Sequence, residues 1–140
     1  MAARDSGFYR YFVDCPSIPH VLFGLEKNGE LAGYFCLALA THVARIADLW
    51  LRSTAVEDWC AGFRTAAAVA ARDEGVYEVT AWASTALGKE ALRGAGFRLR
   101  ERSALSLFGE ARILEGRRVH VQMLDCDASF LSFEAGSYLT

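Results

Sequence analysis

The sequence is poor in the features that mark linkers, membrane spans and secretion signals. Only two of its 140 residues are proline, and no stretch is rich in proline, serine or glutamine, so no long linker is expected. The longest apolar run, residues 31–40, has ten residues, whereas a membrane-spanning helix needs about 20. The first residues lack the basic and apolar regions of a secretory signal. A cytoplasmic protein without membrane contact is therefore expected.

Charge and cysteine do not single out a partner either. The 15 lysines and arginines and the 17 aspartates and glutamates leave a formal net charge of −2, which provides no electrostatic basis for binding nucleic acid. The four cysteines are far apart and form no C-x-x-C pair; Cys36 and Cys60 lie in apolar segments and are interpreted as core thiols. Asp125 and Asp127 alone are too few ligands for a metal site, so none is predicted.

What the chain has in quantity is apolar surface. Apolar residues make up 53% of the 140 residues, which is enough for one domain with a generous core. Strands are predicted over residues 20–27, 31–41, 43–52, 76–83, 97–108 and 117–125. Asn28-Gly29 is a strong hairpin signal between the first two strands, and a second hairpin is expected near residues 115–116.

Helices are predicted between these strands. A helical turn is expected over residues 8–14. A long helix should begin just after Thr54, which forms a capping box with Glu57, and end near Glu74 with Gly75 behind it. A shorter helix over residues 86–95 has Ser84 and Thr85 as candidate caps and stops at Gly96. The order predicts an α/β fold, at the border of α+β, with a mixed sheet and two main helices.

Three local patterns in this order resemble the GNAT superfamily of N-acyltransferases. They are Gly-Tyr-Phe at 33–35 after the hairpin, A-R-I-A-D-L-W-L at 44–51 before the long helix, and A-L-R-G-A-G-F at 91–97 after the second helix. The resemblance implies a short N-terminal segment, 1–19, a GNAT-like domain with a splayed sheet over 20–125, and a tail, 126–140. The family's first strand and at least one helix are expected to be missing or shortened, as in the second half of tandem GNAT-like proteins.

The resemblance also implies a binding site for acetyl-CoA or another acyl-CoA as co-substrate. In the family, pantetheine enters between two splayed strands and the pyrophosphate lies at the start of the long helix. By position, one wall of this site would consist of Leu49, Trp50, Leu51, Arg52, Ser53, Thr54 and Trp59, and the other of Ser84 and Thr85. The acceptor would be the amine of a small molecule or a peptide.

The stretch that matches the family's pyrophosphate loop, residues 55–60, departs from the pattern. It contains no glycine, and Glu57 and Asp58 lie in the first turn of the expected helix. There they already satisfy the helix dipole and would repel a pyrophosphate.

The family's catalytic groups are replaced as well. Leu92 takes the place of the tyrosine general acid, and Arg45 takes the place of the glutamate base. Asp48 and His42 are the substitute candidates for catalysis, because both lie on or beside the same strand. The alternative for Asp48 is that it is exposed or pairs with a neighbouring arginine.

Two functions therefore stay open. One is an acyl-CoA-dependent N-acyltransferase of the GNAT type, and the other is a catalytically degenerate GNAT-like binding or dimerisation module. The high apolar content predicts an interface, with a second copy of the chain or with a missing N-terminal domain. Trp50 and Trp82 flank the expected cleft, and Arg98, Arg100 and Arg102 share one face of an expected strand.

Overall fold

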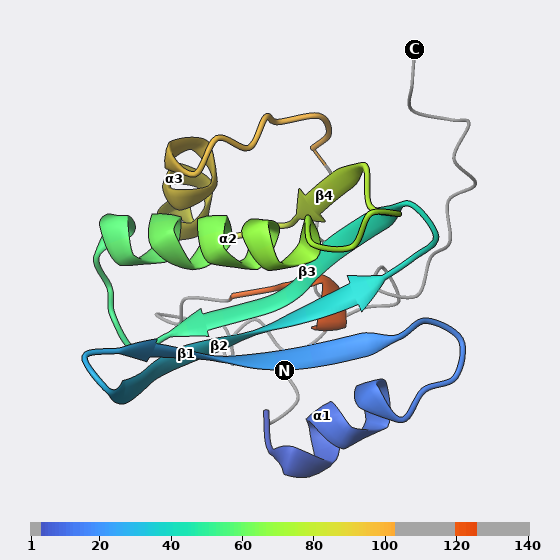
Figure 1. Cartoon of the computed structure of the whole chain (residues 1–140). Coiled ribbons are helices and arrows are strands. Elements are labelled where there is room, and N and C mark those ends of the chain that lie inside the picture. The colour runs from blue at the N-terminus through green and yellow to red at the C-terminus, as the bar shows by residue number, and fades with distance from the viewer. Residues whose placement is uncertain (1–3, 103–119, 126–140) are drawn as a thin grey trace, which may run out of the picture.

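The computed structural model describes residues 4–102 and 120–125 (Figure 1). In chain order the elements are α1 (Ser6–Val13), β1 (His20–Lys27), β2 (Glu30–Leu39), β3 (Val43–Leu51), α2 (Val56–Ala70), β4 (Glu78–Ala81), α3 (Ala86–Gly94) and the 3-10 helix η2 (Met123–Asp125). The predicted α/β class is confirmed.

The four strands form one mixed sheet in the order β1-β2-β3-β4. β1 and β2 are antiparallel, and the turn between them places Asn28 at φ 56° and Gly29 at φ 81°, so the predicted hairpin is confirmed. β2 and β3 are also antiparallel. β4 returns parallel to β3 after the crossover through α2, but the two pair only from Val43 to Ile46 on β3. Beyond this point β3 runs on to Leu51 paired with β2 on one side, and on its β4 side no strand lies beside it among the described residues.

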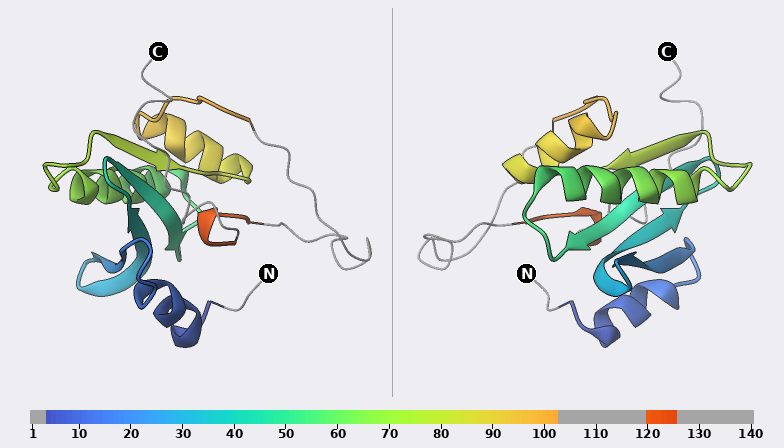
Figure 2. Two further views of the ribbon diagram at one scale, coloured as in Figure 1. Left: turned by 90° about the vertical axis from the view of Figure 1, so that its right-hand side faces the viewer. Right: turned by 60° about the vertical axis from the view of Figure 1, so that its left-hand side comes forward.

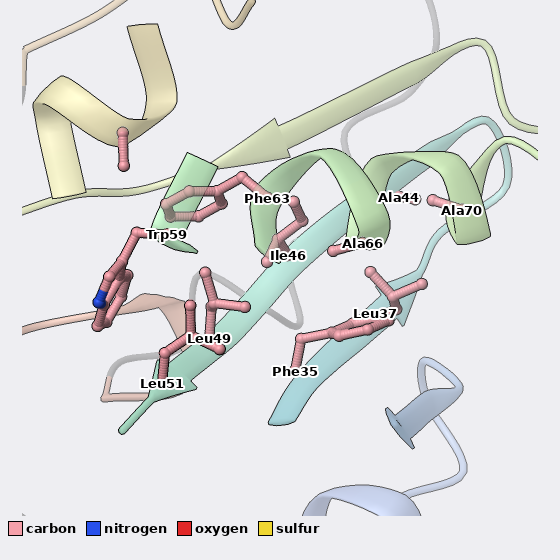
Figure 3. Close-up of a cluster of buried hydrophobic side chains, with 11 residues drawn as sticks. Phe35, Leu37, Ala44, Ile46, Leu49, Leu51, Trp59, Phe63, Ala66 and Ala70 are labelled. Carbon is pink, nitrogen blue, oxygen red and sulfur yellow. The ribbon is translucent and has the colours of Figure 1, made fainter. Parts of the chain in front are cut away.

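One face of the sheet, here called the α2 face, is covered by α2, and α3 packs against α2 (Figure 1). Its core is apolar throughout and consists of Phe35, Leu37, Ala44, Ile46, Leu49, Leu51, Trp59, Phe63, Ala66, Ala70 and Ala91 (Figure 3). The strand residues alternate along β2 as a period of two requires, and the helix residues recur at three- and four-residue steps.

The other face, here called the α1 face, is covered by α1 and η2 (Figure 2). Its apolar cluster is smaller and consists of Phe12, Ile18, Cys36, Ala38, Ala47, Met123 and Leu124. A bulge adjusts β3 to this face: Cys36 pairs with Asp48 and Leu37 with Ile46, which leaves Ala47 as the extra residue. Ala47 joins the apolar cluster and Asp48 meets α1.

The start and end of α2 differ from the prediction. The N-cap is Ala55, which has no side-chain hydrogen bond to offer, so the capping box of Thr54 and Glu57 is wrong. Ser53 takes over part of that role, because its Oγ accepts from the Ala55 N–H at 3.1 Å. The helix ends at Ala70, earlier than expected, and the N–H of Gly75 bonds to Asp73 Oδ1 in the turn that follows.

α1 and α3 agree with the sequence, and the later strands do not. Thr85 caps α3 by accepting from the Gly88 N–H at 3.1 Å, and Gly96 has φ 96° after its end. β4 is shorter than the predicted 76–83. Residues 97–102 and 120–125 contain no strand, although strands were expected there. Residues 103–108 and 117–119 of those strands, and the hairpin near 115–116, lie outside the described residues.

Side chains attach these last segments where ladder bonds were expected. Arg100 reaches β4 through an ion pair with Glu78 at 3.0 Å, and residues 120–125 are held by the contacts described below. Within the described ranges no helix has the length and apolarity needed to cross a bilayer.

Candidate functional site

Asp48, one of the two candidate catalytic residues, is buried on the α1 face and bound by several donors. Its side chain has no exposed surface. Arg4 donates from Nε to Oδ2 at 2.8 Å and from Nη2 to Oδ1 at 3.3 Å, and the Tyr9 hydroxyl donates to Oδ2 at 2.6 Å. The alternative that Asp48 is exposed is therefore wrong, whereas pairing with an arginine is present, and the partner comes from the segment before α1.

Arg4 binds a second carboxylate at the same time. Its Nη1 and Nη2 donate to Oδ1 and Oδ2 of Asp125, at 3.0 and 2.9 Å. This two-pronged geometry is the strong form of an arginine–carboxylate pair. Arg4, Tyr9, Asp48 and Asp125 are called the ionic cluster below. It ties both ends of the described chain to the middle of β3.

The titration of the ionic cluster reflects this pairing. Burial alone would lower the pKa of Arg4, but the bonds to Asp125 and Asp48 raise it. Burial alone would raise the pKa of Asp125, but the Arg4 guanidinium and the Gln122 N–H hold it below its ordinary value. Burial raises the pKa of Tyr9, and its bond to the Asp48 carboxylate raises it further. Cys36, opposite Asp48 on β2, has its pKa raised to about 12 by burial and by that carboxylate.

His42, the other catalytic candidate, lies far from Asp48. It occupies the turn before β3, where its Nδ1 is 3.1 Å from the Gly75 carbonyl oxygen and its ring stacks on Tyr77. Six residues of extended chain, about 20 Å, separate it from Asp48. The structure does not bring the two candidates together.

The gap between β3 and the chain after β4 is closed by residues 120–125, here called the strap (Figure 2). The Gln122 carboxamide bonds both backbone groups of Leu49: Oε1 accepts from its N–H at 2.9 Å, and Nε2 donates to its carbonyl at 2.6 Å. On the far wall, the Val121 N–H donates to Ser84 Oγ at 2.8 Å. The Gln122 side chain thus supplies the two hydrogen bonds that the backbone of a neighbouring strand would make to Leu49.

The remaining residues of the wall on β3 serve the core or the sheet edge. Leu49 and Leu51 are buried in the α2 face. Trp50 points the other way, is 45% exposed, and stacks on Tyr34 with 5.9 Å between ring centroids. The Arg52 N–H donates to the Ala32 carbonyl at 2.9 Å, and its side chain is exposed.

The predicted pyrophosphate loop is held by its own neighbours. Trp59 is buried and donates from Nε1 to the Ser53 carbonyl at 2.7 Å. Asp58 forms an ion pair with Lys27 at 2.7 Å, which, with a bond from Ser53, lowers the pKa of Asp58. Thr54 is exposed beside this loop.

The strap also carries His120, whose ring meets Trp59 edge to face at 5.8 Å. The Nε2 atom of His120 is buried and has no hydrogen-bond partner in the part of the chain that the structure describes. Burial lowers the pKa of His120; Asp48 and Asp125 oppose this shift, and Arg4 adds to it.

The chain matches no family model, and no curated protein or solved structure shows significant similarity to it. Membership of the GNAT superfamily therefore stays a prediction from the sequence patterns. Among residues 4–102 and 120–125, no three histidine, cysteine, aspartate or glutamate side chains gather as they would around a metal ion.

Sequence reasoning missed the residues that organise this region, namely Arg4, Tyr9 and Gln122, and assigned Asp125 only to a weak acidic run. The Arg4–Asp125 and Gln122–Leu49 contacts join positions 121 and 73 residues apart. No local periodicity reports such a pairing.

Proposed function

We propose that this chain is a GNAT-like module that does not transfer acyl groups and that acts by binding a second copy of itself. The observation that carries the proposal is the Gln122 carboxamide on Leu49. In the GNAT family, the backbone of the splayed strand at the position that corresponds to Leu49 faces pantetheine. Here both of its polar groups already have partners, so an acyl-CoA would have to break two buried hydrogen bonds before it gained any.

The start of α2 supports the same conclusion. A pyrophosphate would approach backbone N–H groups beside Glu57 and Asp58, in a stretch without glycine. The negative charges of Glu57 and Asp58 would repel the pyrophosphate at this short distance. Lys27, whose positive charge lies at this loop, is already paired with Asp58.

The chemistry at Asp48 points in the same direction. A general base needs a free carboxylate oxygen within reach of the acceptor amine. Both oxygens of Asp48 accept hydrogen bonds from Arg4, and Tyr9 adds a third bond. Such a carboxylate is suited to holding the fold together.

The partner surface follows from the open edge of the sheet. Within the described residues β1 pairs only with β2, so its outer edge presents backbone donors and acceptors. Val21 and Leu22 on this strand are 38% and 42% exposed. Charged residues protect only its last two positions, Glu26 and Lys27. A second copy that pairs along β1 would cover this apolar edge.

Calorimetric titration with acetyl-CoA tests the first half of the proposal. We expect no saturable heat with the parent chain, with Gln122→Ala, or with a Glu57→Gly/Asp58→Gly double variant. Saturable binding by the parent that free CoA competes away would overturn it. Binding by the Gln122→Ala variant alone would show that Gln122 closes a working groove.

Sedimentation velocity at graded concentrations tests the second half. We expect a concentration-dependent dimer, and Leu22→Lys should convert it to monomer by placing a charge on the edge strand. Leu99→Lys is the matched control, because Leu99 is 66% exposed outside the sheet. A parent chain that stays monomeric throughout would contradict the dimer.

A second candidate is the acyl-CoA-dependent N-acyltransferase. It is favoured by the divergence of β3 from β4 after Ile46, which leaves Leu49 facing a gap rather than a strand. In this case the strap would leave before the co-substrate entered, and Leu49 would offer its N–H to the thioester carbonyl. Activity toward an amine acceptor that rises in Gln122→Ala would support this candidate.

A further inference from the structure

The strap is held by separate polar contacts and carries a titratable group, His120, with a nitrogen that lacks a hydrogen-bond partner among the described residues. Gln122 binds Leu49, Val121 binds Ser84, and Asp125 binds Arg4. Met123 and Leu124 add buried apolar surface on the α1 face. These contacts favour the closed strap. The buried Nε2 of His120 disfavours it, because this atom has no hydrogen-bond partner among the described residues.

A protonated His120 does not fit this position. The neutral ring packs on Trp59 and needs one donor and one acceptor site at most. Protonation would bury a charge with an N–H that finds no acceptor among the described residues, which is costly in a site of low dielectric. The charged groups that face the ring are Asp48, Asp125 and Arg4, and both carboxylates are already bonded to Arg4.

We propose that residues 120–125 are a pH-sensitive strap, which leaves β3 when His120 becomes protonated and so exposes the backbone N–H and carbonyl of Leu49. The device does not depend on the function proposed above, because it concerns only the contacts of the strap with this chain.

The direction of the effect follows from linkage. In the released strap His120 is solvated and takes up a proton near its ordinary pKa of about 6.5. In the closed strap burial lowers the pKa of His120, so the closed form binds fewer protons. The ratio of open to closed strap therefore rises as the pH falls below about 6.5, by at most about tenfold per pH unit, and levels off below the pKa of the closed form.

Hydrogen exchange at two backbone amides, one on β3 and one just after its end, can detect release of the strap. The Leu49 N–H is held by the strap, whereas the Arg52 N–H is held by the Ala32 carbonyl across the sheet. Opening of the strap frees the first and leaves the second in place. Global unfolding exposes both, so the two amides distinguish the mechanisms.

The test measures the protection factors of these two amides on the parent chain between about pH 7 and about pH 5.5, the range in which histidine titrates. We expect the Leu49 protection factor to fall several-fold while that of Arg52 stays constant. His120→Gln should keep Leu49 protected at all pH values, and His20→Gln should retain the parent's slope. A Leu49 value that stays flat, or that falls together with Arg52, overturns the proposal on the parent chain alone. A slope that survives in His120→Gln, or that disappears in His20→Gln, overturns it as well.

Discussion

The two faces of the sheet are held by different means. Among the residues that the structure describes, the α2 face is closed by eleven buried apolar side chains from β2, β3, α2 and α3. The α1 face has seven, and it adds the ionic cluster and the strap, whose partners come from the two ends of the described chain. The buried cluster of the α2 face contains no ionisable side chain that titrates in the neutral range, so its contribution to stability is nearly independent of pH. The α1 face is held partly by the ion pairs of the ionic cluster, so its stability changes with pH and salt.

Phe63→Ala is the substitution that should destabilise the α2 face most. Phe63 is 2% exposed and contacts the rings of Trp59 and Phe97. We expect the free energy of unfolding to fall by about 3–5 kcal/mol, at all pH values, because the lost burial and the cavity do not titrate. Chemical denaturation measures this. Thr65→Ala, at an exposed position of α2, should leave the midpoint nearly unchanged.

On the α1 face the corresponding change is Asp48→Asn, which keeps the size of the side chain and removes its charge. We expect a loss of about 3 kcal/mol near neutral pH, because Arg4 keeps Asp125 but loses its buried partner. Asp14→Asn is the exposed control. A loss no larger than that of the control would mean that the ionic cluster contributes nothing to stability.

The strap is expected to contribute less than the ionic cluster. Gln122→Ala leaves the Leu49 N–H and carbonyl without their present partners and should cost about 1–3 kcal/mol. Glu90→Ala, at an exposed position of α3, is a control of similar side-chain length. If thermal unfolding gives equal midpoints for the two variants, the carboxamide contacts are not part of the stable fold.

The smallest expected effect is a change in the pH dependence of stability at acidic pH. Because the folded pKa of Asp125 lies below its ordinary value of about 3.9, the stability it contributes is fully present above that value and is lost as the pH falls through the lowered folded pKa. Asp125→Asn should therefore flatten the acid limb of a stability–pH curve and leave its alkaline side parallel to that of the parent. An unchanged acid limb would contradict the pairing with Arg4.

Much of the α2 face could be predicted from the sequence, and little of the α1 face could. Phe35 and Leu37 lie in a continuous apolar run that predicts a central strand, and Trp59, Phe63 and Ala66 follow helical spacing, so short-range patterns were sufficient. Thr54 is not the cap because α2 begins one residue later, with Ala55 as its N-cap, and Ser53, two residues before Ala55, accepts from the Ala55 N–H. The bulge at Ala47 turns Asp48 toward Arg4, and neither the bulge nor the partner leaves a mark in the neighbouring residues.

The bond between Arg4 and Asp125 closes a loop of 121 residues, the longest separation among the hydrogen bonds described above. Contacts over such distances form only after the rest of the chain is ordered, because the loop-closure entropy must first be offset by shorter contacts. The ionic cluster is thus expected to be absent from the folding transition state. Its strength would then set how long the folded molecule lasts before it opens, and would have little influence on how fast it folds.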